Sequence, residues 1–152
     1  MRLVSSAFEN CDSIPIQYTG EGEDLSPPLR WQDVPHGTRS LALICDDPDA
    51  PNGTWDHWII YNIPPDVGVL AEGIKDLPYG IQSGHNSWAK TGYGGPLPPS
   101  GKKHRYFFTL YALDTVLQLP KDVKKANLLK AMQRHILAEA SLVGVYESKN
   151  KK

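Results

Sequence analysis

The stretch RYFFTLYAL, residues 105–113, decides the fold, because it is the strongest β-strand candidate in the chain. SLALIC (40–45) is a continuous apolar run, HWIIYNI (57–63) is rich in β-branched and aromatic residues, and IPIQYT (14–19) alternates weakly. Runs that are apolar on both faces are typical of strands in the middle of a covered sheet. The sequence therefore predicts a sheet whose central strands are buried on both sides.

Glycine and proline separate these strands. The chain has 13 Gly and 13 Pro among 152 residues, so together they make about 17%, against about 12% in average proteins. They concentrate in segments such as DPDAPNGT (47–54) and GYGGPLPPSGKK (92–103). Such segments are typical of turns and loops between short strands, and they argue against a helical bundle.

One segment, PKDVKKANLLKAMQRHILAEA (120–140), has helical character and predicts a helix near residues 121 to 138. Its apolar residues recur at three-and-four spacing: Val123, Ala126, Leu129 or Leu128, Met132 and Ile136. SLVGVYE (141–147) then predicts a last strand, and SKNKK (148–152) a frayed basic tail. We expect one domain over residues 1–152, a mainly β sandwich with one helix near the C-terminus.

Composition excludes several function classes. Sixteen Lys and Arg against 17 Asp and Glu give a formal charge of -1, so no basic face for nucleic acid is expected. Apolar runs are shorter than the roughly 18 residues of a spanning helix, and MRLVSSAFEN lacks a signal-peptide core. We therefore expect a cytoplasmic protein that does not span a membrane. Cys11 and Cys45 are expected to be reduced thiols, with Cys45 in a buried strand.

Four polar residues stand at predicted strand ends. His104 and Tyr106 are two apart, so they project from the same face of their strand beside the Pro-rich loop. His57 begins another strand, and Asp47 ends a third where its loop opens. The sequence therefore predicts that these side chains converge on one site.

Three chemistries compete for such a cluster. His57, His104 and Asp47 would suit a metal-dependent enzyme, although no HxH, HExxH or CxxC spacing supports it. A nucleophilic enzyme lacks a GxSxG elbow, and the acidic neighbours of Cys45 would raise its pKa. In an anion pocket, both histidines and the Tyr106 hydroxyl would donate hydrogen bonds, together with the backbone N–H groups of Gly94 and Gly95.

The acidic residues of ICDDPDAPNGTWDHW (44–58) divide into two groups in this interpretation. Asp47 would hold a histidine in its protonated form or meet a positive group on a zwitterion such as phosphoethanolamine. Asp46, Asp49 and Asp56 are expected to brace the turn by accepting hydrogen bonds from backbone N–H groups. Aromatic walls are expected from Trp55, Trp58 and Trp88.

Longer segments of the chain resemble a known family. DDPDAP followed by DHWIIYNIP, and then GYGGPLPPSGKKHRYFFTLYAL, are similar to the two signature regions of the phosphatidylethanolamine-binding protein family, also called Raf kinase inhibitor-like proteins. IPIQYTGEGEDLSPPLRW and LAEASLVGVY resemble its first and last segments. The resemblance covers nearly the whole chain, and it is to the short bacterial and archaeal branch.

This resemblance implies a Greek-key β-sandwich of two antiparallel sheets, with a small cavity that takes phosphate, acetate or phosphoethanolamine. By motif position it assigns Asp47, His57, His104 and Tyr106 to ligand binding. It adds Gly95 and Pro96 at the pocket floor. The pocket rim is assigned to Pro51, Trp88, Pro98 and Pro99. No metal and no cofactor are implied.

The leading hypothesis is therefore a non-enzymatic binding protein for a small anionic, phosphorylated head group. The first alternative is an inhibitor or regulator of a protease or protein kinase, and the second is the metal-dependent enzyme. The extra C-terminal helix of eukaryotic members has no counterpart, so kinase inhibition is the least transferable function. Bacterial members are often dimers, so a homodimer is among the assemblies that the resemblance allows.

Overall fold

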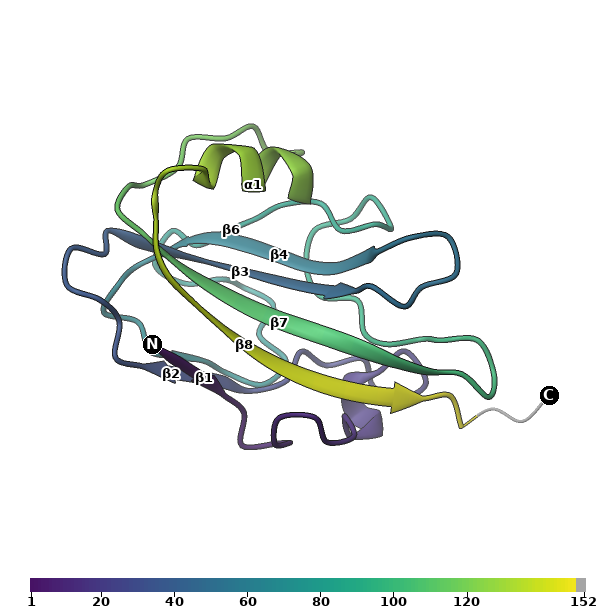
Figure 1. The fold of residues 1–152 in the computed structure, drawn as a ribbon. Helices are drawn as coiled ribbons and strands as arrows, with labels where there is room; N and C mark the ends of the chain where they lie inside the picture. Colours follow the sequence, from purple (N-terminus) through teal and green to yellow (C-terminus); the bar gives the residue numbers. More distant parts are fainter. Residues whose placement is uncertain (150–152) are drawn as a thin grey trace.

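A computed structural model describes residues 1–149, which form two antiparallel sheets and one α-helix (Figure 1). The five-stranded sheet has the order β6-β4-β3-β7-β8, and the three-stranded sheet has the order β1-β2-β5. The bounds of the larger sheet's strands are Gln82–Ser83 (β6), Trp55–Ile63 (β4), Ser40–Asp47 (β3), Lys103–Leu113 (β7) and Ile136–Glu147 (β8). Those of the smaller sheet are Arg2–Val4 (β1), Leu29–Gln32 (β2) and Val69–Leu70 (β5). The prediction of a mainly β sandwich with one late helix is confirmed.

The five-stranded sheet is the middle of three layers. In Figure 1 the helix α1 (Lys125–Met132) covers one face of this sheet, and β1 and β2 lie against the other. Leu41, Leu43 and Cys45 of β3 belong to the core between the sheets, while Ala42 and Ile44 face the core under the helix. Side chains alternate along a strand, so a strand between two cores must be apolar at every position. This arrangement explains the continuous apolar run of β3.

The strand β7 contributes most to the core between the sheets. Tyr106, Phe108, Leu110 and Ala112 all point into that core. Fully burying one large apolar side chain stabilises the fold by about 1.5–3 kcal/mol. β7 also pairs with β3 on one side and β8 on the other, along its full length with β8. The stretch 105–113 is therefore central to the sheet, as its composition predicts.

The helix is shorter than the sequence predicts, and the last strand is longer. Instead of continuing to residue 138, the helix ends at Met132, and Arg134 takes a left-handed backbone conformation with φ of 69°. His135 Nδ1 pairs with Asp114 Oδ1 at 2.7 Å, and Ile136 then pairs with Leu113 of β7. Pairing with β7 overrides the helical spacing of residues 136–138, because it satisfies the strand's backbone groups along β7.

The structure also differs from two smaller sequence-based expectations, for residues 14–19 and for the C-terminal tail. IPIQYT (14–19) does not form a strand; Ile16–Tyr18 is a short 3-10 helix. The basic tail begins in an ordered contact, because Ser148 Oγ and Lys149 N donate hydrogen bonds to the Glu21 carboxylate. Residues 150–152 of the predicted tail lie outside the described residues. Within residues 1–149 no helix is long and apolar enough to cross a membrane.

Candidate functional site

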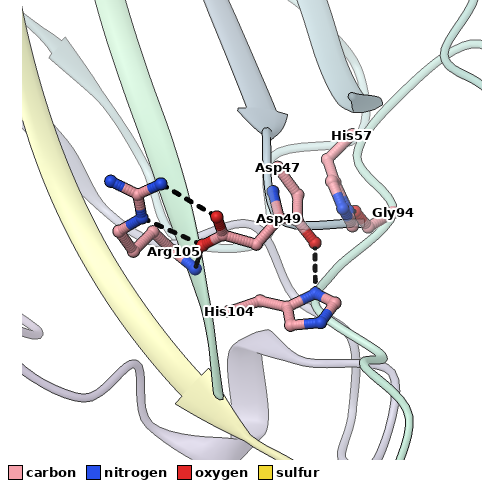
Figure 2. A network of polar contacts seen from close by, with 6 residues as sticks. All are labelled: Asp47, Asp49, His57, Gly94, His104 and Arg105. Carbon is pink, nitrogen blue, oxygen red and sulfur yellow. Dashed lines mark hydrogen bonds and ion pairs between the residues drawn. The ribbon is translucent and has the colours of Figure 1, made fainter. Parts of the chain in front are cut away.

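Four side chains predicted to converge do lie around one cavity, of about 630 Å³. Asp47 comes from the end of β3, His57 from near the start of β4, and His104 and Tyr106 from the start of β7. These three strands are antiparallel neighbours, so the end of β3 meets the starts of β4 and β7 at the same edge. Figure 2 shows Asp47, His57 and His104 at this edge.

Asp47 and His104 form a buried pair in this cavity. The Nδ1–H group of His104 donates to Asp47 Oδ2 at 2.7 Å, and the two residues are only 6% and 3% exposed. The second carboxylate oxygen, Oδ1, accepts a hydrogen bond from the backbone N–H of Asp49 at 2.8 Å. Asp47 therefore orients the His104 ring, as a carboxylate beside a histidine commonly does.

His57 is held in a different way. Its Nδ1–H group donates to the backbone carbonyl of Gly94 at 2.6 Å, since a carbonyl oxygen can only accept. Its ring packs edge-on against Trp88 and Tyr106, each with a centroid distance of 5.2 Å. Burial lowers the pKa of His57 below its usual value of 6.5, and the Gly94 hydrogen bond and Asp47 oppose that shift. At neutral pH this ring is therefore mainly uncharged.

The Tyr106 hydroxyl is the least satisfied polar group of the cavity. Tyr106 is 1% exposed, and its hydroxyl has no hydrogen-bond partner among the described residues. Burial, and secondarily the negative charge of Asp47, raise the pKa of Tyr106 well above its ordinary range, so the hydroxyl keeps its proton. Buried polar groups almost always have a partner. This cavity thus contains a donor that the described part of the chain leaves unused.

The glycine-rich loop plays a different role from the one predicted. The Gly94 N–H donates to the His57 carbonyl, and the Gly95 N–H donates to Asp24 Oδ1 at 2.7 Å. Neither group is therefore free to bind an anion, because each amide hydrogen is already used. Gly95 and Pro96 are buried and do not line the cavity. The Pro96 carbonyl accepts from Gly20 N instead.

Close packing explains why glycine occupies positions 94 and 95. A Cβ atom on Gly94 would come within 2.3 Å of the Trp88 ring, and one on Gly95 within 2.4 Å of Asp24 Oδ1. Both distances are far below van der Waals contact. The loop therefore positions Trp88 and, through the Gly94 carbonyl, the His57 ring. In the EGED segment (21–24), the carboxylates of Asp24 and Glu21 also accept hydrogen bonds from distant residues, Gly95 and Tyr146 respectively.

The predicted rim residues surround the opening. The cavity lining includes Pro51, Trp88, Pro98 and Pro99, and Trp55, which packs edge-on against Trp88. Trp58 is not part of it; this side chain is 1% exposed and packs against Tyr93 in the core. Lining residues that the sequence did not assign include Leu97 and Lys124. Lys124 is the N-cap residue directly before α1, so no local pattern connects it with the strand ends.

The other three carboxylates of the stretch 44–58, those of Asp46, Asp49 and Asp56, bind basic side chains. The sequence predicts only hydrogen bonds from backbone N–H groups of the turn. Asp49 forms a two-point ion pair with the Arg105 guanidinium and also accepts the Arg105 backbone N–H (Figure 2). These contacts lower the pKa of Asp49 to about 2. Lys125 Nζ lies 2.7 Å from Asp56 Oδ1 and 3.1 Å from Asp46 Oδ2. Asp46 and Asp56 thus attach α1 to the sheet, which the sequence did not predict.

The competing chemistries gain little support from the geometry. Within residues 1–149 no group of three or more His, Cys, Asp or Glu side chains is arranged to hold a metal ion. Nδ1 of His57 is hydrogen-bonded to the Gly94 carbonyl, and Nδ1 of His104 is hydrogen-bonded to the Asp47 carboxylate. Cys45 is buried in the core, where burial first and then Asp46 and Asp47 raise the pKa of its thiol. A thiol in this state is a poor nucleophile.

A partly polar cavity at one sheet edge of a β-sandwich is the kind of concave site in which proteins bind small ligands. Comparison with known proteins identifies the family. The family model described as "Phosphatidylethanolamine-binding protein" matches residues 4–147, and the chain belongs to this family. A UPF0098 protein of Methanothermobacter thermautotrophicus is 53% identical over 149 residues, which is 96% of this chain and 98% of that protein.

Solved structures agree with this assignment. CT736 of Chlamydia trachomatis, described as a homologue of phosphatidylethanolamine-binding proteins, is 44% identical, with a TM-score of 0.91 and 97% of each chain covered. YbcL of Escherichia coli, described as a new member of the mammalian family, is 32% identical, also with a TM-score of 0.91. The match covers 97% of this chain and 98% of YbcL. Family membership supports a binding role in general.

Proposed function

We propose that this chain is a metal-free, non-enzymatic protein that binds a small anionic head group, such as phosphate, acetate or phosphoethanolamine. The observation that carries the proposal is the Tyr106 hydroxyl, a buried donor of a cavity-lining residue that has no partner among residues 1–149. A buried polar group left unpaired costs about 1–3 kcal/mol, and a ligand oxygen would remove that cost. The resemblance of the signature regions supports the same conclusion.

The neighbouring side chains suit this ligand class. His104 and His57 are fixed through Nδ1, and in the described part of the chain no hydrogen bond involves Nε2 of either ring. Asp47 is buried beside them, which favours a ligand that also carries a positive group, as phosphoethanolamine does. Charge-assisted hydrogen bonds contribute about 1.5–3 kcal/mol each, so a few of them suffice for a head group without metal.

Histidine NMR on protein purified without phosphate or acetate tests the proposal. Adding inorganic phosphate or phosphoethanolamine should shift the ring signals of His57 and His104. His135 lies outside the cavity and pairs with Asp114, so its signals should stay unchanged and serve as the internal control. Ring signals of His57 and His104 that do not move at millimolar ligand would contradict the proposal.

A Tyr106→Phe variant separates binding from stability. Loss of a hydrogen bond to a charged ligand should weaken phosphate binding about tenfold or more. The free energy of unfolding should stay the same or rise slightly, because the lost hydroxyl has no hydrogen-bond partner in the part of the chain that the structure describes. Calorimetric titration and urea unfolding measure the two quantities. Equal affinity in both proteins would remove the Tyr106 hydroxyl from the site.

A second candidate function, docking of a protein partner such as a kinase or protease, is favoured by one observation. Trp55, Trp88 and Leu97 at the cavity mouth are 36%, 39% and 58% exposed. Exposed apolar groups around a pocket are common at binding surfaces. If this rim carries partner binding, His104→Ala should retain the partner while a Trp88→Ser variant loses it. Failure to recover any partner in a pull-down would count against this function.

A further inference from the structure

One peptide unit connects the His57 ring with a carboxylate that lies outside the cavity. The carbonyl of this unit belongs to Gly94 and accepts the hydrogen bond of His57 Nδ1–H at 2.6 Å; Figure 2 shows Gly94 beside the ring. The N–H group of the same unit belongs to Gly95 and donates to Asp24 Oδ1 at 2.7 Å. The peptide is trans, so its carbonyl and its N–H group point in opposite directions within one plane. The Gly94–Gly95 peptide therefore stands between the Asp24 carboxylate and the His57 imidazole, with one hydrogen bond to each.

The residues on either side of this peptide do little to fix its orientation. Both are glycines without a Cβ atom, so rotation about the flanking backbone bonds is less restricted than between other residues. Larger residues are excluded by close contact with the Trp88 ring at position 94 and with the Asp24 carboxylate at position 95. The orientation of the peptide must therefore come mainly from its hydrogen bonds.

Asp24 belongs to a segment that is fixed to the glycine-rich loop on both sides of the peptide. Before the peptide, the Tyr93 hydroxyl donates to the Tyr18 carbonyl at 2.6 Å. After it, the Gly20 N–H donates to the Pro96 carbonyl at 2.9 Å. The side chain of Asp24 is exposed and does not line the cavity. Any effect of this carboxylate on a ligand must therefore pass through the loop.

The negative charge of Asp24 also acts on the ring. Burial lowers the pKa of His57, whereas the Gly94 hydrogen bond, Asp47 and Asp24 each oppose that shift. A carboxylate polarises the peptide to which it is hydrogen-bonded, and the carbonyl at the other end becomes a stronger acceptor. The contact between Asp24 and Gly95 thus strengthens the hydrogen bond that holds the imidazole through Nδ1.

We propose that Asp24 is a positioning residue of the pocket, which through the Gly94–Gly95 peptide holds the His57 ring in the orientation that binds a head group. This inference deepens the proposed function and rests on it. Asp24 influences ligand affinity without touching the ligand, and it does so by restraining a peptide that its two glycines leave free to rotate.

A pair of Asp24 variants tests this role. Asp24→Ala removes the acceptor of the Gly95 N–H, and because the site is at the surface, water can replace it and the chain should still fold. A water molecule is not fixed in position, so calorimetric titration with inorganic phosphate should show about tenfold weaker binding. Asp24→Asn keeps an oxygen acceptor, and its affinity should stay within about threefold of the wild type.

Glu23→Ala is the matched control. Glu23 is an exposed carboxylate next to Asp24 and does not line the cavity either, so this variant removes a nearby charge alone, and phosphate affinity should not change. An Asp24→Ala variant that binds phosphate as tightly as the wild type would overturn the inference and leave the proposed function intact. If the wild type itself does not bind phosphate at millimolar concentration, the proposed function fails and this inference fails with it.

Nitrogen NMR of the ligand-free protein separates positioning of the ring from a general loss of stability. In the wild type the neutral His57 ring should carry its proton on Nδ1, because the Gly94 carbonyl is its acceptor. In Asp24→Ala the ring should exchange between its two neutral forms, and its pKa should be lower than in the wild type. Asp24→Asn should restore the form protonated on Nδ1. The signals of His104, which is held by Asp47, should stay unchanged in both variants.

Two outcomes of the NMR measurement would contradict the inference. Wild-type His57 signals in a folded Asp24→Ala variant would show that the peptide keeps its orientation without the carboxylate. The measurement on the wild type does not depend on the folding of any variant. A neutral wild-type ring that carries its proton on Nε2 would overturn the inference directly, because the Gly94 carbonyl would then not be holding Nδ1–H.

Discussion

Asp46 and Asp47 are neighbours in sequence but serve opposite faces of the same sheet. Asp47 faces the cavity, where it is 3% exposed and holds the His104 ring. Asp46 faces the helix side, where it shares Lys125 with Asp56 and is partly exposed. Successive residues of a strand point to opposite faces, so one step along β3 separates the site from a structural contact.

The comparison teaches that residue type alone does not reveal a role. Both residues are carboxylates with a basic partner at hydrogen-bond distance. They differ in burial and in the partner's chemistry, since Asp47 orients an imidazole in a cavity and Asp46 holds an ammonium group at the base of a helix. Their energetic weights should differ accordingly, because exposed ion pairs contribute little and buried ones are costly to break.

The largest expected effect is that of Asp47→Ala. Removing one partner of a buried pair leaves the His104 Nδ1–H and the Asp49 N–H without an acceptor. We expect a loss of about 3 kcal/mol in the free energy of unfolding, together with loss of phosphate binding. Urea unfolding and calorimetric titration measure both. A variant as stable as the wild type would show that the pair is not the buried contact described above.

Asp46→Ala is the matched variant with a smaller expected effect. Lys125 keeps Asp56 as a partner, so the loss in unfolding free energy should be about 1 kcal/mol or less, and phosphate affinity should not change. The same two measurements apply. If this variant weakened phosphate binding as strongly as Asp47→Ala, the distinction between the two faces of β3 would not hold.

The smallest expected effect is a pH dependence confined to the cavity side. Because burial lowers the pKa of His57 below 6.5 in the folded state, the unfolded chain binds more protons over that range. Stability should therefore decrease as the pH falls from about 6.5 toward the folded-state pKa, and His57→Gln should reduce this slope. Thermal unfolding at several pH values measures it. A slope equally steep in His57→Gln would exclude His57 as its source.

Much of the fold could be predicted from local pattern. The central strands were identified because burial on both faces demands an apolar residue at every position, as in SLALIC and RYFFTLYAL. The end of the helix could not be predicted in this way, because Ile136 fits the three-and-four helical spacing as well as it fits a strand. Only the presence of β7 alongside, with Leu113 opposite Ile136, decides between the two. The choice of Leu128 over Leu129 as the buried helix residue likewise depends on the sheet beneath it.

In the candidate site, too, some features could be predicted from local pattern and others depend on distant segments. Strand alternation placed His104 and Tyr106 on one face, and the strand ends correctly suggested that Asp47 and His57 lie nearby. The backbone donors assigned to Gly94 and Gly95 were wrong, because their N–H groups bind His57 O and Asp24 Oδ1. Asp24 lies 71 residues before Gly95, and such a contact has no signature in either segment.

The sequence by itself therefore determined which segments are buried strands, which segments turn, and which polar residues stand at strand ends. These properties depend on the burial of each residue and on backbone alternation, both of which leave a local pattern. Only the tertiary structure decided which hydrogen-bonding groups remain unused. That the Tyr106 hydroxyl has no partner within residues 1–149, and that Nδ1 of His57 is used by the Gly94 carbonyl, follows from register and loop packing between distant segments, and these set the chemistry that the cavity offers to a ligand.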